Sequence, residues 1–300
     1  MQRYRTALAT SSTFDPLDIW YLRIELDKLD ELGLHAERKG SAKQIAAVEA
    51  TAAHRNRLGA LAKLTEVVDG HRRIRDRPPL IRRLTPDDFE SEAQRVMAFF
   101  DRYMTSLPLD RRHLLRRYRL TDLSLKVVGI GSVGTRCLMA LFESGDNEPL
   151  FLQIKEAGPS VLERFVGHRV AGQHGRRVVE GQQLVQSAVE VFLGWSHYDG
   201  PVGAADYYVR QLWDGKASAS IDVMSPKVLT SYAELCGGVL ARAHARSGDA
   251  AAISGYIGSD DAFDRAITSF AVAYARRNEN DHAAIVAAIA SGELIVKRDI

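Results

Sequence analysis

The stretch that decides the fold reads Val127-Val128-Gly129-Ile130-Gly131-Ser132-Val133-Gly134. Its apolar start predicts the end of a β-strand, and its glycines have the spacing G-x-G-x-x-G. Glycine has no β-carbon, so backbone amides in such a loop can approach a phosphate closely. The spacing alone leaves three interpretations open: a dinucleotide site in a Rossmann unit, a kinase-like nucleotide loop, and a glycine turn that binds nothing.

The residues after the loop distinguish the two binding interpretations. A Rossmann unit needs a helix at once and then a strand ending in an acid, which 135–145 and Glu156 would supply. A kinase-like lobe needs a strand, a turn and a further strand that carries a lysine. The turn-forming segment Ser144–Pro149 and Lys155, at the end of a β-rich run, fit that order. We therefore expect 135–142 to be a strand that pairs with both neighbours.

A helical pattern from Arg176 to Val191 follows the lysine and carries Glu180 on a half-buried line. We expect Glu180 to form an ion pair with Lys155, which would aim the ammonium at nucleotide phosphates beneath the glycine loop. The alternative is a surface glutamate unrelated to the lysine. The expected cofactor is ATP with Mg²⁺, and the predicted cofactor-binding residues are Gly129, Gly131, Ser132, Gly134, Lys155 and Glu180.

A second candidate site lies in the segment Ala243–Asp249, at the end of a later helix. His244, Arg246 and Asp249 offer a base, a cation and a carboxylate, which are the groups of a phosphoryl-transfer site, and we predict them as catalytic residues. The alternative is an ordinary helix end, where histidine and arginine complement the helix dipole and Gly248 caps the helix.

Other chemistries are excluded by the motifs that the sequence lacks. Cys137 and Cys236 lie in apolar stretches without metal-ligand spacing, so we expect no metal site. There is no G-x-S-x-G, H-E-x-x-H or Walker A sequence, which argues against hydrolase and metalloprotease functions.

The composition and net charge of the chain limit the classes of binding partner that we expect. The chain has 300 residues, of which 46% are hydrophobic and 26% charged, as is typical of a soluble globular protein. Its net charge of +2 is too small for a bulk attraction to nucleic acid or to a membrane, so neither is expected as a partner. The amino terminus has no long apolar segment, and we expect a cytoplasmic location.

We expect a mixed α+β protein whose small antiparallel sheet bears the glycine loop and is flanked by helical regions. The expected regions are a mainly helical one at 1–120, a kinase-like sheet lobe at 121–216 and a helical one at 217–300. Helix starts are predicted at Asp15-Pro16 and Thr85-Pro86.

Two further patterns carry expectations about exposure. The arginine-rich run His71–Arg77 is interpreted as a solvated linker, with a phosphate site as the alternative. The apolar stripes of 229–243 and 263–274 are interpreted as core-packing faces of helices.

Six blocks of this sequence resemble one bacterial family, the domain of unknown function 2252 family. The blocks are Gly129–Arg136, Phe151–Ala157, Arg177–Gln182, Phe192–Trp195, Tyr208–Leu212 and Ala243–Asp249. Together they are highly specific and cover about Val127 to Ser291, with a looser similarity before them. The family is uncharacterised and is regarded as related to protein-kinase-like and aminoglycoside-phosphotransferase-like folds. The resemblance therefore favours the kinase-like interpretation.

The chain departs from that family in one respect. Longer members carry, ahead of the matched region, G-D-x-H-x-x-N and D-F-D-E segments that resemble a catalytic loop and a metal-binding acid. Here, Gly145-Asp146 and Gly248-Asp249 are the two Gly-Asp pairs, and neither is followed by that histidine and asparagine. We expect an amino-terminally shortened member: a kinase-like nucleotide-binding protein, phosphotransferase-like if active, with an unknown phosphate acceptor and an incomplete catalytic set. The alternatives are a non-catalytic interaction or regulatory module and, less favoured, a Rossmann-type NAD-binding protein.

Overall fold

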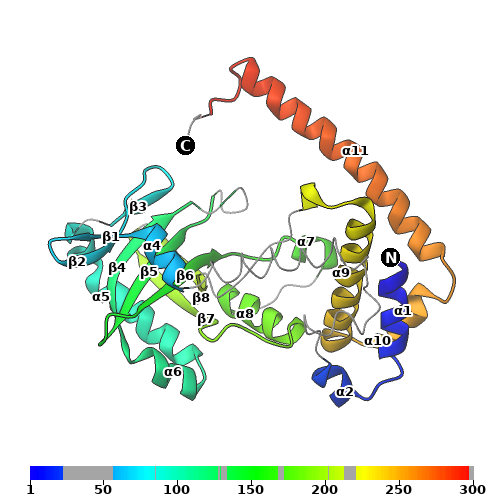
Figure 1. Ribbon diagram of the computed structural model, residues 1–300, viewed down its shortest axis with the longest axis horizontal. Coiled ribbons are helices and arrows are strands. Elements are labelled where there is room, and N and C mark those ends of the chain that lie inside the picture. Colours follow the sequence, from blue (N-terminus) through cyan, green and yellow to red (C-terminus); the bar gives the residue numbers. More distant parts are fainter. Residues whose placement is uncertain are drawn as a thin grey trace. The chain divides into compact units, whose positions relative to one another are not determined.

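The computed structural model describes residues 1–22, 57–84, 86–127, 129, 134–167, 172–201, 203–212 and 221–296. These residues form two compact units, which are described separately (Figure 1). The sheet unit comprises the described residues of Ala42–Ala219, and the helical unit those of Met1–Ser41 and Ser220–Ile300. The protein thus has a mixed α and β structure with antiparallel sheets.

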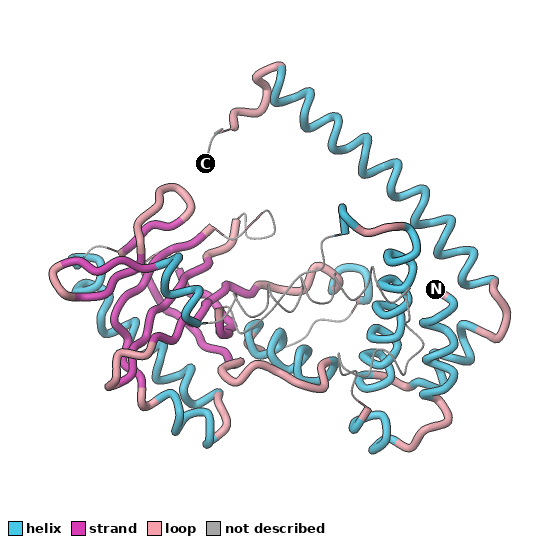
Figure 2. Tube along the Cα trace, viewed as in Figure 1, coloured by secondary structure: helices cyan, strands magenta, loops and turns pink. Residues whose placement is uncertain are grey.

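An antiparallel sheet, magenta in Figure 2, forms the centre of the sheet unit. It has six strands in the order β3-β4-β5-β6-β8-β7. Its strands are β3 Ile81–Arg83, β4 Tyr118–Lys126, β5 Cys137–Ser144, β6 Pro149–Ala157, β7 Gly194–Gly200 and β8 Gly203–Gln211. The strand expected at 135–142 is confirmed as β5, which pairs with both β4 and β6. A Rossmann unit would have a helix at this position.

The predicted turn between β5 and β6 is also confirmed. The amide of Ser144 donates to the carbonyl of Glu148 at 3.0 Å, and Asn147 has a φ of +59°. Asparagine tolerates this left-handed conformation better than most residues, which fits it to a tight connection between antiparallel strands.

The two faces of the sheet have separate cores, because alternate side chains of a strand point to opposite sides. On one face, Leu152 and Ile154 of β6 pack with α5 (Pro86–Ser106). On the other face, Phe151 packs with α4 (Arg57–Leu64) and the hairpin of β1 (Thr65–Val68) and β2 (His71–Ile74). The remaining helices of this unit are α6 (Leu109–Leu115), α7 (Glu163–Val166) and α8 (His174–Val185).

The helix predicted to start at Thr85-Pro86 corresponds to α5, and the helical pattern at 176–191 corresponds to α8. α5 ends at Ser106, just before Pro108, whereas Thr85 lies outside the described residues. α8 ends at Val185, earlier than the pattern suggested. The chain beyond it is held to β8 by Glu190, whose carboxylate accepts hydrogen bonds from the Arg210 guanidinium and the Gln211 amide.

The arginine-rich run is not a solvated linker. Residues 71–74 form β2, and Arg72 pairs with Glu143 at 3.1 Å. Arg75 donates to the carbonyl of Thr65 at 2.6 Å. The region 1–120, which we expected to be mainly helical, therefore includes strands. Its arginines have carboxylate and carbonyl acceptors within the sheet unit, so they are not simply solvated.

The helical unit contains α1 (Gln2–Ser11), α2 (Pro16–Tyr21), α9 (Pro226–Ser247), α10 (Ala250–Ile257), α11 (Ala262–Ala290) and a 3₁₀ turn at Ile221–Val223. The predicted start of α2 is confirmed, with Asp15 at its N-cap position. The core of this unit joins α1 to the small residues of α9, chiefly Leu8, Ala241 and Ala245.

The predicted apolar stripes of the last helices contribute little to the core of this unit. Phe263 packs against that core, whereas the stripe residues Leu229, Val239, Leu240, Phe270 and Tyr274 are exposed. α9 buries Ala241, Ala245 and Arg246 instead, and α11 buries no residue. Phe270 and Tyr274 stack on each other with ring centroids 5.8 Å apart while both remain exposed. Within the described part of the chain, no helix has the length and apolar character needed to span a membrane.

Candidate functional site

Four residues form a row across the sheet, on the face that carries Phe151. Cys137 pairs with Lys155, Lys155 with Tyr208, and Tyr208 with Trp195, on strands β5, β6, β8 and β7. Directly paired residues of antiparallel strands point to the same side, so these four side chains share one face. The row lies at the end of β5 that adjoins the glycine loop.

A second lysine joins this row. Lys126 is the last residue of β4 and pairs with Ile81, a core residue of the same face. Burial lowers the pKa of Lys126, and the ammonium of Lys63 lowers it further. Burial raises the pKa of the Cys137 thiol, while Lys155 and Lys126 oppose that rise. Both ammonium groups are therefore close enough to the thiol to influence its charge.

The lysines give this end of the sheet a positive character. Among the described residues, neither Lys126 nor Lys155 has a carboxylate as an ion-pair partner. A partly buried ammonium group without a counter-ion is attracted to an anion, since the anion offsets the loss of solvation. The arrangement can hold a phosphate or another small anion.

In the sequence, the glycine motif connects β4, which ends at Lys126, to β5, which begins at Cys137. Gly129 has a φ of +130° and Gly134 a φ of +80°, and both conformations strain residues that have a β-carbon. Gly131 and Ser132 lie outside the described residues. The structure thus requires glycine at the first and last of the three motif positions.

Glu180 does not reach Lys155. Its carboxylate pairs with Nε of Arg176, one turn earlier on α8, at 2.7 Å. The Arg176 guanidinium lies 5.7 Å from the ring centroid of Trp195 on the edge strand β7. Trp195 and Lys155 are separated by β8, which corresponds to roughly 10 Å at the usual strand spacing. A local i,i+4 pair therefore takes the place of the expected ion pair.

The second predicted set of residues lies in the helical unit, where each has a structural contact. The Tyr4 hydroxyl is 2.8 Å from Nδ1 of His244. Arg246 donates to the carbonyl of Trp20 at 2.9 Å and lies 4.0 Å from the centroid of its ring. The Asp249 carboxylate caps α10 by accepting from the amide of Ala252 at 2.9 Å.

Two of these residues also line a hollow. Arg246 and Asp249 border a cavity of about 450 Å³ together with Trp20 and residues of the turn after α1. His244 is not among its lining residues. The structure therefore brings Arg246 and Asp249 to one cavity and leaves the predicted base outside it.

Lys126 is a site residue that no sequence motif indicated. It precedes Gly129 by three residues, and the alternation of Leu125 and Lys126 places them on opposite faces. With the strand register known, this alternation places Lys126 on the face that carries Lys155. Among the described residues, no three histidine, cysteine or acidic side chains are grouped so that they could hold a metal ion.

Comparison with known proteins identifies one family. The family model described as "Uncharacterized protein conserved in bacteria (DUF2252)" matches residues 1–288. No curated protein and no solved structure gives a significant match. The match covers both the sheet unit and most of the helical unit, including the region before Val127 where the resemblance was looser. The chain therefore belongs to the bacterial domain of unknown function 2252 family.

Proposed function

We propose that the protein is a kinase-like nucleotide-binding protein that holds the phosphates of ATP with Mg²⁺ at the glycine loop and the two adjacent lysines. The observation that carries the proposal is the position of Lys126 and Lys155, which share one face beside the loop without a described carboxylate partner. Phosphate oxygens would supply the missing negative charge.

The order of elements around the loop supports the same function. β4 leads into the glycine loop, β5 and β6 follow as a hairpin, Lys155 lies on β6, and α8 comes next. A kinase-like lobe uses this order to cover the phosphates with the loop and to place a lysine against them. Lys155 lies on the same face of the sheet as Trp195. The ring of Trp195 contacts Arg176 of α8.

Titration calorimetry with MgATP, MgADP and NAD tests the proposal. We expect the magnesium nucleotides to bind and Lys155→Met to weaken that binding about 10- to 100-fold, the effect of losing one charged hydrogen bond. Lys126→Met should weaken it as well. Lys227→Met, which removes an exposed lysine of the helical unit, is the matched control and should bind like the unmodified chain. Binding that is absent, or unchanged in Lys155→Met, would refute the site.

A non-catalytic module is the second candidate, and one observation favours it. The carboxylate of Glu180 is engaged by Arg176 and is not available to position Lys155. If Glu180 nevertheless serves the nucleotide site, Glu180→Gln should weaken MgATP binding while Arg176→Gln should not. If both variants bind like the unmodified chain, Glu180 has no role in the site, and the non-catalytic module is favoured.

A further inference from the structure

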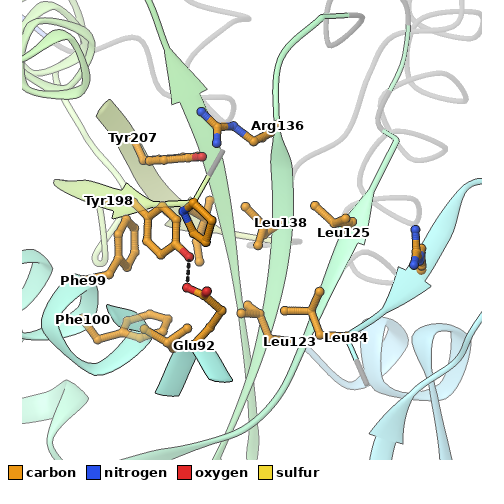
Figure 3. A pocket seen from close by; sticks show the side chains of 14 residues that line it. Leu84, Glu92, Phe99, Phe100, Leu123, Leu125, Arg136, Leu138, Tyr198 and Tyr207 are labelled. Carbon is orange, nitrogen blue, oxygen red and sulfur yellow. Dashed lines mark hydrogen bonds between the residues drawn. The ribbon is translucent and has the colours of Figure 1, made fainter. Parts of the chain in front are cut away.

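The face of the sheet opposite the lysines contains a cavity of about 590 Å³, between the sheet and α5 (Figure 3). Small-molecule sites typically fall between about 300 and 1,000 Å³. Most of the wall is apolar and comes from α5 and from strands β4, β5 and β6. Its apolar residues include Val96, Phe99, Phe100, Leu123, Leu138 and Ile154.

One end of this cavity is polar. The Arg136 guanidinium is held by Glu156, which accepts from Nε at 2.8 Å and from Nη2 at 3.3 Å. The third nitrogen, Nη1, takes part in neither bond. The side chain lies 5.9 Å from the centroid of the Tyr207 ring, and the Tyr207 hydroxyl points toward it (Figure 3).

The Tyr207 hydroxyl is a donor without a described acceptor. Burial raises its pKa to about 12, so it keeps its proton at neutral pH. No hydrogen bond from this hydroxyl to a described group is present in the structure. Together with Nη1 of Arg136 it offers two N–H or O–H donors at the same end of the cavity.

The carboxylate on the opposite wall is already satisfied. The Glu92 carboxylate accepts from the Tyr198 hydroxyl and pairs with Arg95 at 2.9 Å (Figure 3). Arg82 is a further lining residue, on β3. The described lining residues and their ion-pair partners carry three positive charges, on Arg82, Arg95 and Arg136. They carry two negative charges, on Glu92 and Glu156, so the net charge of this set is +1.

We propose that this cavity binds a monocarboxylate with an apolar body, such as a medium-chain acyl or aryl carboxylic acid. The body lies against the leucine and phenylalanine wall, and the carboxylate accepts from Nη1 of Arg136 and from the Tyr207 hydroxyl. This site is independent of the proposed nucleotide site, because Tyr207 and its neighbour Tyr208 point to opposite faces of β8.

Calorimetric titration with decanoate below its micelle concentration and with decanol below its solubility limit, both without nucleotide, tests the proposal. The two probes share the apolar chain and differ in the head group. We expect decanoate to bind at least about tenfold more tightly than decanol, as a charge-assisted hydrogen bond predicts. Tyr207→Phe should weaken decanoate binding about tenfold and decanol binding less, because the neutral alcohol oxygen accepts a weaker hydrogen bond than a carboxylate does.

A cavity-filling variant keeps the proposal falsifiable. Leu125 lines the cavity but is partly exposed, so Leu125→Trp can occupy the space with little strain, and it should abolish the binding of both probes. Lys227→Met is the control. Equal affinities for decanoate and decanol would overturn the carboxylate assignment, and decanoate binding that survives Leu125→Trp would overturn the location. Absence of binding by the folded chain would overturn the site, whatever the MgATP titration shows.

Discussion

Replacing Asp122 by asparagine should destabilise the sheet unit, because this buried carboxylate joins three segments. Its Oδ2 accepts from the Ile74 amide at 2.7 Å and from Nε of Arg83 at 3.0 Å. Its Oδ1 accepts from the Leu123 amide at 3.0 Å. All three neighbours are donors, and an asparagine side chain has one acceptor oxygen and one donor NH₂ group.

The amide variant loses least if its oxygen faces Ile74 and Arg83 and its NH₂ group faces Leu123. One buried backbone amide is then unsatisfied, which costs about 1–3 kcal/mol, and the bond to Arg83 loses its charge on one side, which costs about 1 kcal/mol more. A total of about 3 kcal/mol corresponds to a fall in Tm of roughly 6–12 °C for a unit of this size.

Thermal unfolding followed by circular dichroism measures this change. Asp146→Asn, in the exposed turn between β5 and β6, is the matched control and should leave Tm within about 1 °C, as surface substitutions do. If Asp122→Asn unfolds at the same temperature as the control, the contacts with Ile74 and Arg83 do not hold the hairpin to the sheet.

Three further predictions concern pH, the N-cap of α10 and catalysis. The pKa of His197 is raised chiefly by its hydrogen bond to Asp206, at 2.6 Å, so protonated His197 stabilises the fold. This contribution is complete below the unfolded pKa of about 6.5 and is lost as pH rises through the folded value. His197→Gln should therefore remove that pH dependence from urea unfolding curves, and an unchanged dependence would contradict the assignment. Asp249→Asn should leave stability nearly unchanged, because asparagine also caps helices, whereas Asp249→Ala should cost about 1 kcal/mol. The 300-residue chain should bind MgATP without turnover in a phosphate-release assay, and turnover abolished by Asp249→Asn would place the catalytic site there.

The sequence predicted the elements whose determinants are local. The glycines, the turn residues of Ser144–Pro149 and the β-rich run that ends at Lys155 are sufficient to predict β5, β6 and the hairpin between them. Pro86 and Pro108 likewise mark the limits of α5, which begins at the first proline and ends before the second. In each case the residues that determine the structure are within a few positions of it.

Partners across the fold could not be predicted in this way. The pair of Arg72 with Glu143 joins residues 71 positions apart, and the salt bridge of Arg136 with Glu156 depends on strand register. The predicted pair of Glu180 with Lys155 relied on helix periodicity. Periodicity indicates the face of the helix on which a residue lies, but not which cation its carboxylate binds. The stripe of α11 shows the same limit, because an apolar pattern does not say whether another element covers it.

Because the two faces of β6 contribute to different sites, insertions and deletions within this strand should be rare among related sequences. Ile154 lines the cavity on one side, and its neighbour Lys155 belongs to the lysine row on the other. One inserted residue within β6 would move every later side chain of the strand to the opposite face and exchange the contents of the two sites. Length differences among relatives should therefore occur in the turn at 144–149 and not within the strands. An alignment that places a gap inside β6 would pair residues of unlike environments.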